Sequence, residues 1–102
     1  MVSIKTINSP SQGVVNILLR KINDDHIKNN LQKGLINSLG LIQGQLSEII
    51  VAGDVAEKAS NVNITEITGM CPQHMSVIGV FGDTASVSEA LKAVDKELNK
   101  DK

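Results

Sequence analysis

The sequence predicts an α/β fold of the α+β type: a ferredoxin-like split βαβ domain with an antiparallel sheet and helices on one face. The length of 102 residues supports one domain, because chains below roughly 200 residues rarely form separate cores. The content of 41% hydrophobic and 21% charged residues is typical of a globular protein. From residue 35 onward the apolar pattern gives the order strand, helix, strand, strand, helix. That order is a βαββαβ unit without its last strand.

The first 33 residues are predicted to form two strands and one short helix. Apolar and polar residues alternate over Val2–Ile7, which indicates a short strand. The run Val14–Leu19 is apolar and begins with β-branched residues, which predicts a second strand. A polar residue, Asn23 or Asp24, then caps a short helix that Gly34 ends.

The core segment is expected to contain three strands and two long helices. The strands are expected over Leu35–Ile42, Val62–Ile67 and Val77–Phe81, the first helix over Gln45–Ser60, and the last helix after an N-cap at Asp83 or Thr84. The apolar stripe of the first helix is Leu46, Ile49, Ile50, Gly53 and Ala56. The buried face of the last helix is Val87, Ala90, Leu91, Val94 and Leu98.

The missing last strand leaves one edge of the sheet open, and an open edge is a pairing liability. We expect the strand over Val14–Leu19 to fill it, so that the domain is circularly permuted. The chain then divides into N-terminal strands with a short helix (1–33), a βαββα core (34–98) and a polar tail that frays (99–102).

Composition excludes several classes of function. The net charge of −1 and the lack of a long basic patch give no support to a nucleic-acid partner, and Phe81 is the sole aromatic residue, so bases have no stacking platform. No apolar run approaches the roughly 20 residues of a membrane-spanning helix. The first residues lack the apolar segment of a signal peptide, and we therefore expect a cytoplasmic protein with a reduced thiol.

The stretch Gly69–Met75 carries the lone cysteine, Cys71, in a predicted loop between two strands. A lone cysteine often packs as a small buried hydrophobic residue. A nucleophilic role with His74 as base is disfavoured, since no acidic residue or oxyanion hole is evident nearby. A metal role requires more than one chain, because iron–sulfur clusters usually take four cysteine ligands. The sequence keeps these three alternatives open.

Two segments resemble the shell-protein domain of bacterial microcompartments. They are Ser38-Leu39-Gly40-Leu41-Ile42 followed by a helix that ends Glu57-Lys58-Ala59-Ser60-Asn61-Val62, and Ile78-Gly79-Val80-Phe81-Gly82-Asp83 followed by Val87-Ser88-Glu89-Ala90-Leu91. The N-terminal part resembles the permuted branch of that family, which carries a β-hairpin and a strand at the front of the chain. The run Gly69-Met70-Cys71-Pro72-Gln73 is similar to a motif of the divergent shell proteins of glycyl-radical propanediol compartments.

The resemblance implies a structural protein that is not an enzyme. Such proteins form homohexameric tiles of a polyhedral shell in the cytoplasm, beside other shell proteins and around encapsulated enzymes. The loop between the second and third core strands lines the pore, so six copies of Cys71 would surround one axis. The resemblance thus implies an iron–sulfur cluster, of the 4Fe-4S type, shared between subunits. The pore-loop residues are Gly69, Met70, Pro72, Gln73 and His74, of which Gln73 and His74 are candidate donors of hydrogen bonds to the cluster.

Further expectations concern the edge and the face of the tile. Lys58 matches a lysine that the family uses at contacts between hexamers, although a lysine near a helix C-terminus is also favoured by the helix dipole. The N-terminal hairpin is expected to form a small barrel over the pore. Two other functions stay open: a tile whose pore passes small polar metabolites without metal, and a ferredoxin-like regulatory domain that binds a metabolite.

Overall fold

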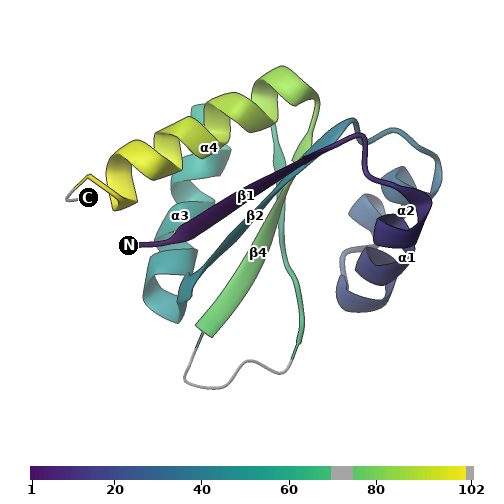
Figure 1. The fold of residues 1–102 in the computed structure, drawn as a ribbon, viewed down its shortest axis with the longest axis horizontal. Coiled ribbons are helices and arrows are strands. Elements are labelled where there is room, and N and C mark those ends of the chain that lie inside the picture. The colour runs from purple at the N-terminus through teal and green to yellow at the C-terminus, as the bar shows by residue number, and fades with distance from the viewer. Residues whose placement is uncertain (70–74, 101–102) are drawn as a thin grey trace.

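The computed structural model describes residues 1–69 and 75–100. In them four helices pack against the two faces of a four-stranded sheet (Figure 1). In chain order the elements are β1 (Ser3–Asn8), α1 (Gln12–Lys21), α2 (Asp25–Gln32), β2 (Ser38–Gln45), α3 (Leu46–Ala59), β3 (Asn63–Glu66), β4 (Met75–Gly82) and α4 (Thr84–Leu98). The strand order across the sheet is β1-β2-β4-β3, and every neighbouring pair is antiparallel.

The sheet confirms the predicted split βαβ unit and its permutation. Elements β2, α3, β3, β4 and α4 are the expected βαββα core, although β2 begins three residues later than the sequence suggested. Strand β1 pairs antiparallel with β2, from Ser3 opposite Gln43 to Asn8 opposite Ser38. It therefore occupies the edge that the missing last strand of the unit would fill.

The prediction of a strand over Val14–Leu19 is wrong, because this run lies in the middle of helix α1. Ser11 caps the helix by accepting a hydrogen bond from the backbone N–H of Val14 at 3.3 Å. Val15 and Leu18, three residues apart, are buried, whereas the side chain of Ile17 is 46% exposed. Burial at helical spacing outweighs the weak β-propensity of the branched residues. The strand that fills the sheet edge is β1 instead.

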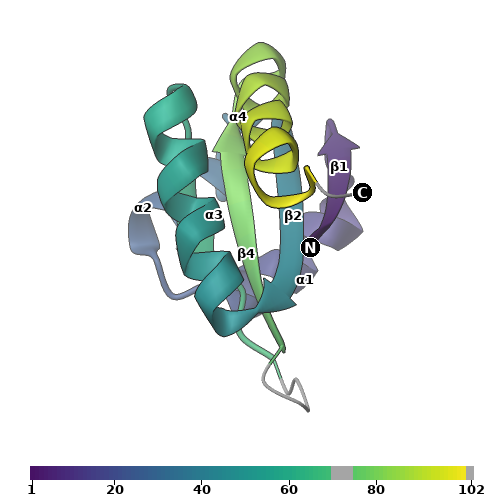
Figure 2. The same ribbon diagram turned by 90° about the vertical axis from the view of Figure 1, so that its left-hand side faces the viewer.

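Two apolar clusters lie on opposite faces of the sheet. Helices α3 and α4 cover one face, where Ile42, Ile78 and Val80 point toward them. The expected helical layer is thus present. Helices α1 and α2 add a second layer on part of the other face, over Leu39 and Phe81 (Figures 1 and 2). The expected N-terminal hairpin is therefore also wrong, since the segment between β1 and β2 is a helix pair.

The short helix α2 forms where the sequence predicted it. The carboxylate of Asp24 accepts a hydrogen bond from the backbone N–H of Ile27 at 3.0 Å and caps the first turn. Ile27 and Leu31 are buried on one side of the helix. Gly34 then adopts a φ of +70°, which residues with a Cβ atom rarely adopt, and the chain turns toward β2.

The apolar stripe predicted for α3 is confirmed in part. Ile49 and Ala56 are buried against the sheet, but the side chains of Leu46 and Ile50 are 53% and 65% exposed. The sheet and α4 cover one side of α3, and the remaining apolar side chains of its first turns face outward. The buried face of α4 matches its prediction at Val87, Ala90, Leu91 and Val94, with Leu98 partly buried. In the described part of the chain, no helix is both long and apolar enough to cross a membrane.

Candidate functional site

The connection between β3 and β4 begins and ends at one end of the sheet. The backbone N–H of Ile67 donates to the carbonyl of Val77 at 2.9 Å and extends the β3–β4 ladder toward the connection. Met75, the first residue of β4, lies opposite Gln45, the last residue of β2. The ends of three strands therefore meet where the predicted pore loop leaves the sheet.

The first flank of the connection is attached to helix α1. Thr68 donates two hydrogen bonds to the carbonyl oxygen of Lys21, one from its backbone N–H at 2.8 Å and one from Oγ1 at 2.9 Å. Lys21 is the last residue of α1, where carbonyls lack partners within the helix. The contact satisfies such a carbonyl and ties the start of the loop to the α1–α2 pair. No sequence pattern pointed to Thr68, because the two residues lie 47 positions apart.

Five predicted site residues, Met70, Cys71, Pro72, Gln73 and His74, lie outside the described residues. Gly69, the sixth member of the predicted loop, is exposed, and a side chain there would meet no other atom within 4 Å. Within residues 1–69 and 75–100, no group of three or more histidine, aspartate or glutamate side chains is placed to hold a metal ion.

Lys58 lies in the last turn of α3, at the end of the helix farthest from the loop. Its Nζ is 2.9 Å from a carboxylate oxygen of Asp54, one turn earlier, and its side chain is 77% exposed. An exposed pair of this kind contributes little to stability and leaves the lysine accessible. The role of Lys58 at a contact between tiles remains a prediction.

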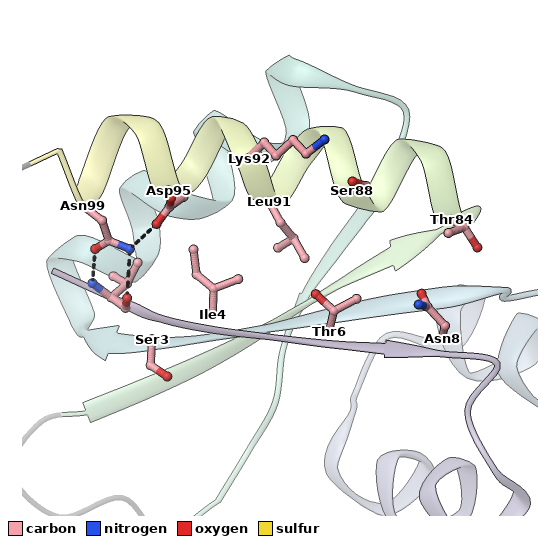
Figure 3. A pocket seen from close by; sticks show the side chains of 11 residues that line it. Ser3, Ile4, Thr6, Asn8, Thr84, Ser88, Leu91, Lys92, Asp95 and Asn99 are labelled. Atoms are coloured by element: carbon pink, nitrogen blue, oxygen red, sulfur yellow. Dashed lines mark hydrogen bonds between the residues drawn. The ribbon is translucent and has the colours of Figure 1, made fainter. Parts of the chain in front are cut away.

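A groove of about 520 Å³ separates β1 from α4 at one edge of the sheet (Figure 3). Ile4 of β1 and Leu91 of α4 point toward each other in this groove, and Thr6, Ser88 and Lys92 lie among its polar residues. No predicted site residue lies in this groove. The alternation of apolar and polar residues in β1 could not predict this groove, because the sequence did not show which helix would lie above the strand.

Asn99 closes one end of this groove, although the sequence placed it in a fraying tail. Its side-chain oxygen accepts from the backbone N–H of Val2 at 2.8 Å, and its Nδ2 donates to the carbonyl of Val2 at 3.1 Å (Figure 3). Asn99 is 7% exposed. The amide side chain thus pairs with the start of the chain as a neighbouring strand would, and joins it to the end of α4.

A second groove of about 490 Å³ lies at the opposite edge of the sheet, between α3 and β3. Its apolar lining includes Leu46, Ile50, Ile64 and Ile78. Leu46 and Ile50 belong to the predicted stripe of α3, which the sequence analysis expected to be buried. The exposed face was missed because amphipathic periodicity does not show how much of a helix its neighbours cover.

Glu48 and Asp83 have lowered pKa values, and each shift has a structural cause. The pKa of Glu48 is lowered, mainly by its hydrogen bond with the N-terminal ammonium group at 2.6 Å. The pKa of Asp83 is lowered by hydrogen bonds from the backbone N–H and the hydroxyl of Ser86 at the N-cap of α4. His26 is exposed and bonds with the side chain of Asn30, as expected of a surface residue.

The strand order, with β1 in the place of the last strand, defines a circularly permuted ferredoxin-like domain. Residues 38–102 match the family model for the BMC domain. A search of curated proteins finds no match. The solved structures include a GrpU microcompartment shell protein from Clostridiales bacterium 1_7_47FAA that is 34% identical, with a TM-score of 0.68. The alignment covers 95% of this chain and 92% of that one.

A second GrpU microcompartment shell protein, from Pectobacterium wasabiae, is 25% identical with a TM-score of 0.68, over 91% of this chain and 99% of the other. The fused permuted hexameric shell protein MSM0275 of the RMM microcompartment has a TM-score of 0.72 at 19% identity. That alignment covers 95% of this chain and 45% of the other, and it supports the permuted fold. The chain therefore belongs to the BMC-domain family of bacterial microcompartment shell proteins.

Membership confirms four predictions. The protein is a structural component of a microcompartment shell in the bacterial cytoplasm, it is not an enzyme, and its tiles assemble together with other shell proteins. The resemblance to the GrpU proteins, given by the Cys71 motif and the permuted front of the chain, is confirmed as well.

Proposed function

We propose that the protein forms homohexameric shell tiles that hold an iron–sulfur cluster in the central pore through Cys71 of several subunits. One observation supports this most directly: both flanks of the Cys71 connection, Thr68 and Met75, lie at the same end of the sheet. A subunit that points this end at a rotation axis brings all copies of the cysteine together. A permuted shell protein of the same fold is described as hexameric.

The donor chemistry fits a cluster provided that the ring forms. Each chain contributes one cysteine, whereas a cubane cluster takes four thiolate ligands. Six copies of Cys71 exceed that number, so the ring symmetry is broken and some thiols stay without iron. Gln73 and His74 follow the cysteine and supply donors that tune such a site. When bound, a cluster supplies one-electron transfer, which suits passage of electrons across the shell, or it plugs the pore.

The outer contacts of the tile belong to Lys58 in this proposal. A helix of 14 residues such as α3 is about 21 Å long, so Lys58 lies far from the loop end of the subunit. If the loop lies on the axis, the lysine lies toward the rim of the hexamer. There it contacts neighbouring tiles, of this or another shell protein, while encapsulated enzymes lie on one side of the shell.

The test is anaerobic purification of the wild type and of Cys71→Ser, with visible absorption, iron and sulfide analysis, and mass measurement. The expected wild type is a coloured hexamer with one cluster per ring, and the expected variant is a colourless hexamer. Met75→Leu is the matched control, because it removes a neighbouring sulfur atom that does not ligate iron. A colourless wild-type hexamer that passes small polar solutes supports the metal-free pore instead. A monomeric wild type overturns both forms of the proposal.

A further inference from the structure

The first flank of the β3–β4 connection is held by hydrogen bonds in two opposite directions. The backbone N–H of Ile67 points to β4 and donates to the carbonyl of Val77 at 2.9 Å. In an extended chain the next N–H points the other way, and that of Thr68 donates to the carbonyl of Lys21 at 2.8 Å. Figure 1 shows this segment running beside the end of α1. The two opposed bonds restrain rotation of the chain about its own axis.

The hydroxyl group of Thr68 adds a third contact. Its Oγ1 donates to the same carbonyl of Lys21 at 2.9 Å, so one acceptor receives a backbone and a side-chain hydrogen bond from one residue. A carbonyl oxygen has two lone pairs and accepts both. The two bonds together fix the side-chain rotamer of Thr68 and the direction of its backbone.

The acceptor of these two bonds belongs to the packed part of the domain. Leu18 and Ile22, on either side of Lys21 in the chain, are buried in the apolar cluster between the sheet and the α1–α2 pair. Ile67 packs against the same cluster. The carbonyl of Lys21 therefore cannot shift far unless the helix pair opens this cluster. Precise sites are built on supports of this kind.

The second flank of the connection has a different anchor. Met75 is the first residue of β4 and lies opposite Gln45 of β2, so this flank is part of a regular ladder. Strand β3, in contrast, ends at Glu66. Beyond it, the contact of Thr68 with α1 determines the direction in which the first flank leaves the sheet.

We propose that Thr68 is a positioning residue for Cys71, three residues farther along the chain, and that the α1–α2 pair is its support. This rests on the proposed function, in which Cys71 of several copies ligates one cluster. Thiolates from several chains reach one cluster when each copy of the connection leaves its sheet in the same direction. Groups around the ligands of a metal orient those ligands and tune the metal. Thr68 acts in this way through the chain, without touching the metal.

Thr68→Val tests this role, because valine keeps the branched shape and the backbone N–H and removes the hydroxyl donor. The side chain of Thr68 is exposed, so the variant keeps its fold and its ring, which circular dichroism and native mass spectrometry verify. Thr68→Ser restores the hydroxyl and is the rescue variant. Thr65→Val is the matched control, the same substitution on β3 at a hydroxyl that bonds to none of the described residues.

The first measurement needs no cluster. A nitroxide label on Cys71, the single thiol of the chain, reports local motion through its EPR line shape, and sparse labelling keeps the spins of one ring from interacting. We expect a narrower, more mobile spectrum for Thr68→Val, and wild-type spectra for Thr68→Ser and Thr65→Val. Corrected for intrinsic rates, hydrogen exchange of the amide at position 68 should be about fivefold faster in Thr68→Val, the effect of losing one ordinary hydrogen bond.

The second measurement examines the cluster in anaerobically purified hexamers. We expect the EPR spectrum of the dithionite-reduced cluster to be broadened in Thr68→Val and restored in Thr68→Ser. A residue with a purely structural role would lower the urea midpoint and leave this spectrum unchanged.

Three results overturn the inference: a wild-type label or cluster spectrum in Thr68→Val, an equal change in Thr65→Val, or loss of the ring in Thr68→Val. The last of these would make Thr68 an assembly residue. A wild type that binds no cluster refutes the proposed function alone, and the label spectra then still decide whether Thr68 positions Cys71.

Discussion

Gly79 and Phe81 lie two residues apart on β4 and share the face of the sheet that α1 and α2 cover. A Cβ atom built at Gly79 would lie 2.5 Å from Cε2 and 2.6 Å from Cζ of the Phe81 ring. Phe81 is fully buried, so its ring has little room to move. We predict that Gly79→Ala costs about 1–3 kcal/mol of unfolding free energy, as overpacking of a filled core does.

The aromatic ring of Phe81 causes this cost, and a double-mutant cycle measures its contribution. Phe81→Leu removes the two nearest ring atoms and alone costs about 1 kcal/mol, the order of the difference between Phe→Ala and Leu→Ala substitutions. In that background Gly79→Ala stabilises by about 0.4–1 kcal/mol, because the backbone at Gly79 has a negative φ that alanine adopts. The coupling between the two sites, the difference between these two effects of Gly79→Ala, is then about 1.4–4 kcal/mol.

Urea unfolding of wild type, both single variants and the double variant, at one protomer concentration, measures the coupling. The fixed concentration matters because assembly raises apparent stability. Effects that add within about 0.5 kcal/mol would show that the ring does not limit space at Gly79 and would refute the packing described here.

Three further changes test the termini, a cap and a turn. Asn99→Ala leaves the buried N–H and carbonyl of Val2 without partners and should cost about 1–3 kcal/mol in urea unfolding. Asp83 has a folded pKa below its ordinary value of 3.8, so its stabilising effect is complete above that value and is lost as the pH falls through the folded pKa. Asp83→Asn should therefore lower the melting temperature at pH 7 and have little effect in acid. Gly34→Ala forces a side chain into a φ of +70° and should cost about 1 kcal/mol, whereas Gly13→Ala, in helix α1 with open space around it, should stabilise slightly.

The core of the domain was predictable because its signals are local. The buried faces of α2 and α4 follow from helical spacing, and their N-caps are carboxylates with a donor three residues on. The order of elements from β2 to α4 and the open sheet edge followed from the same patterns. The single cysteine and its Pro-Gln neighbours directed attention to one loop, and the role of that loop stays a prediction.

The run Val14–Leu19 shows where local signals fail. Its five apolar residues suit a buried strand as well as one side of a helix, and the choice between them depends on which other segments of the chain pack against the run. The face of the sheet at Leu39 and Phe81 needs a cover, and α1 and α2 provide it. β1 already pairs with β2 at the open edge, so a strand over Val14–Leu19 would have no free edge there.

The sequence by itself determined the fold class, the permutation and the residue type on which a metal role depends. The tertiary structure decided which N-terminal segment completes the sheet, that Thr68 ties the loop to α1, and that Asn99 holds the start of the chain. It also decided that Leu46 and Ile50 face outward. The physical reason is that periodicity records which side chains share a face, whereas burial depends on the area that distant segments cover.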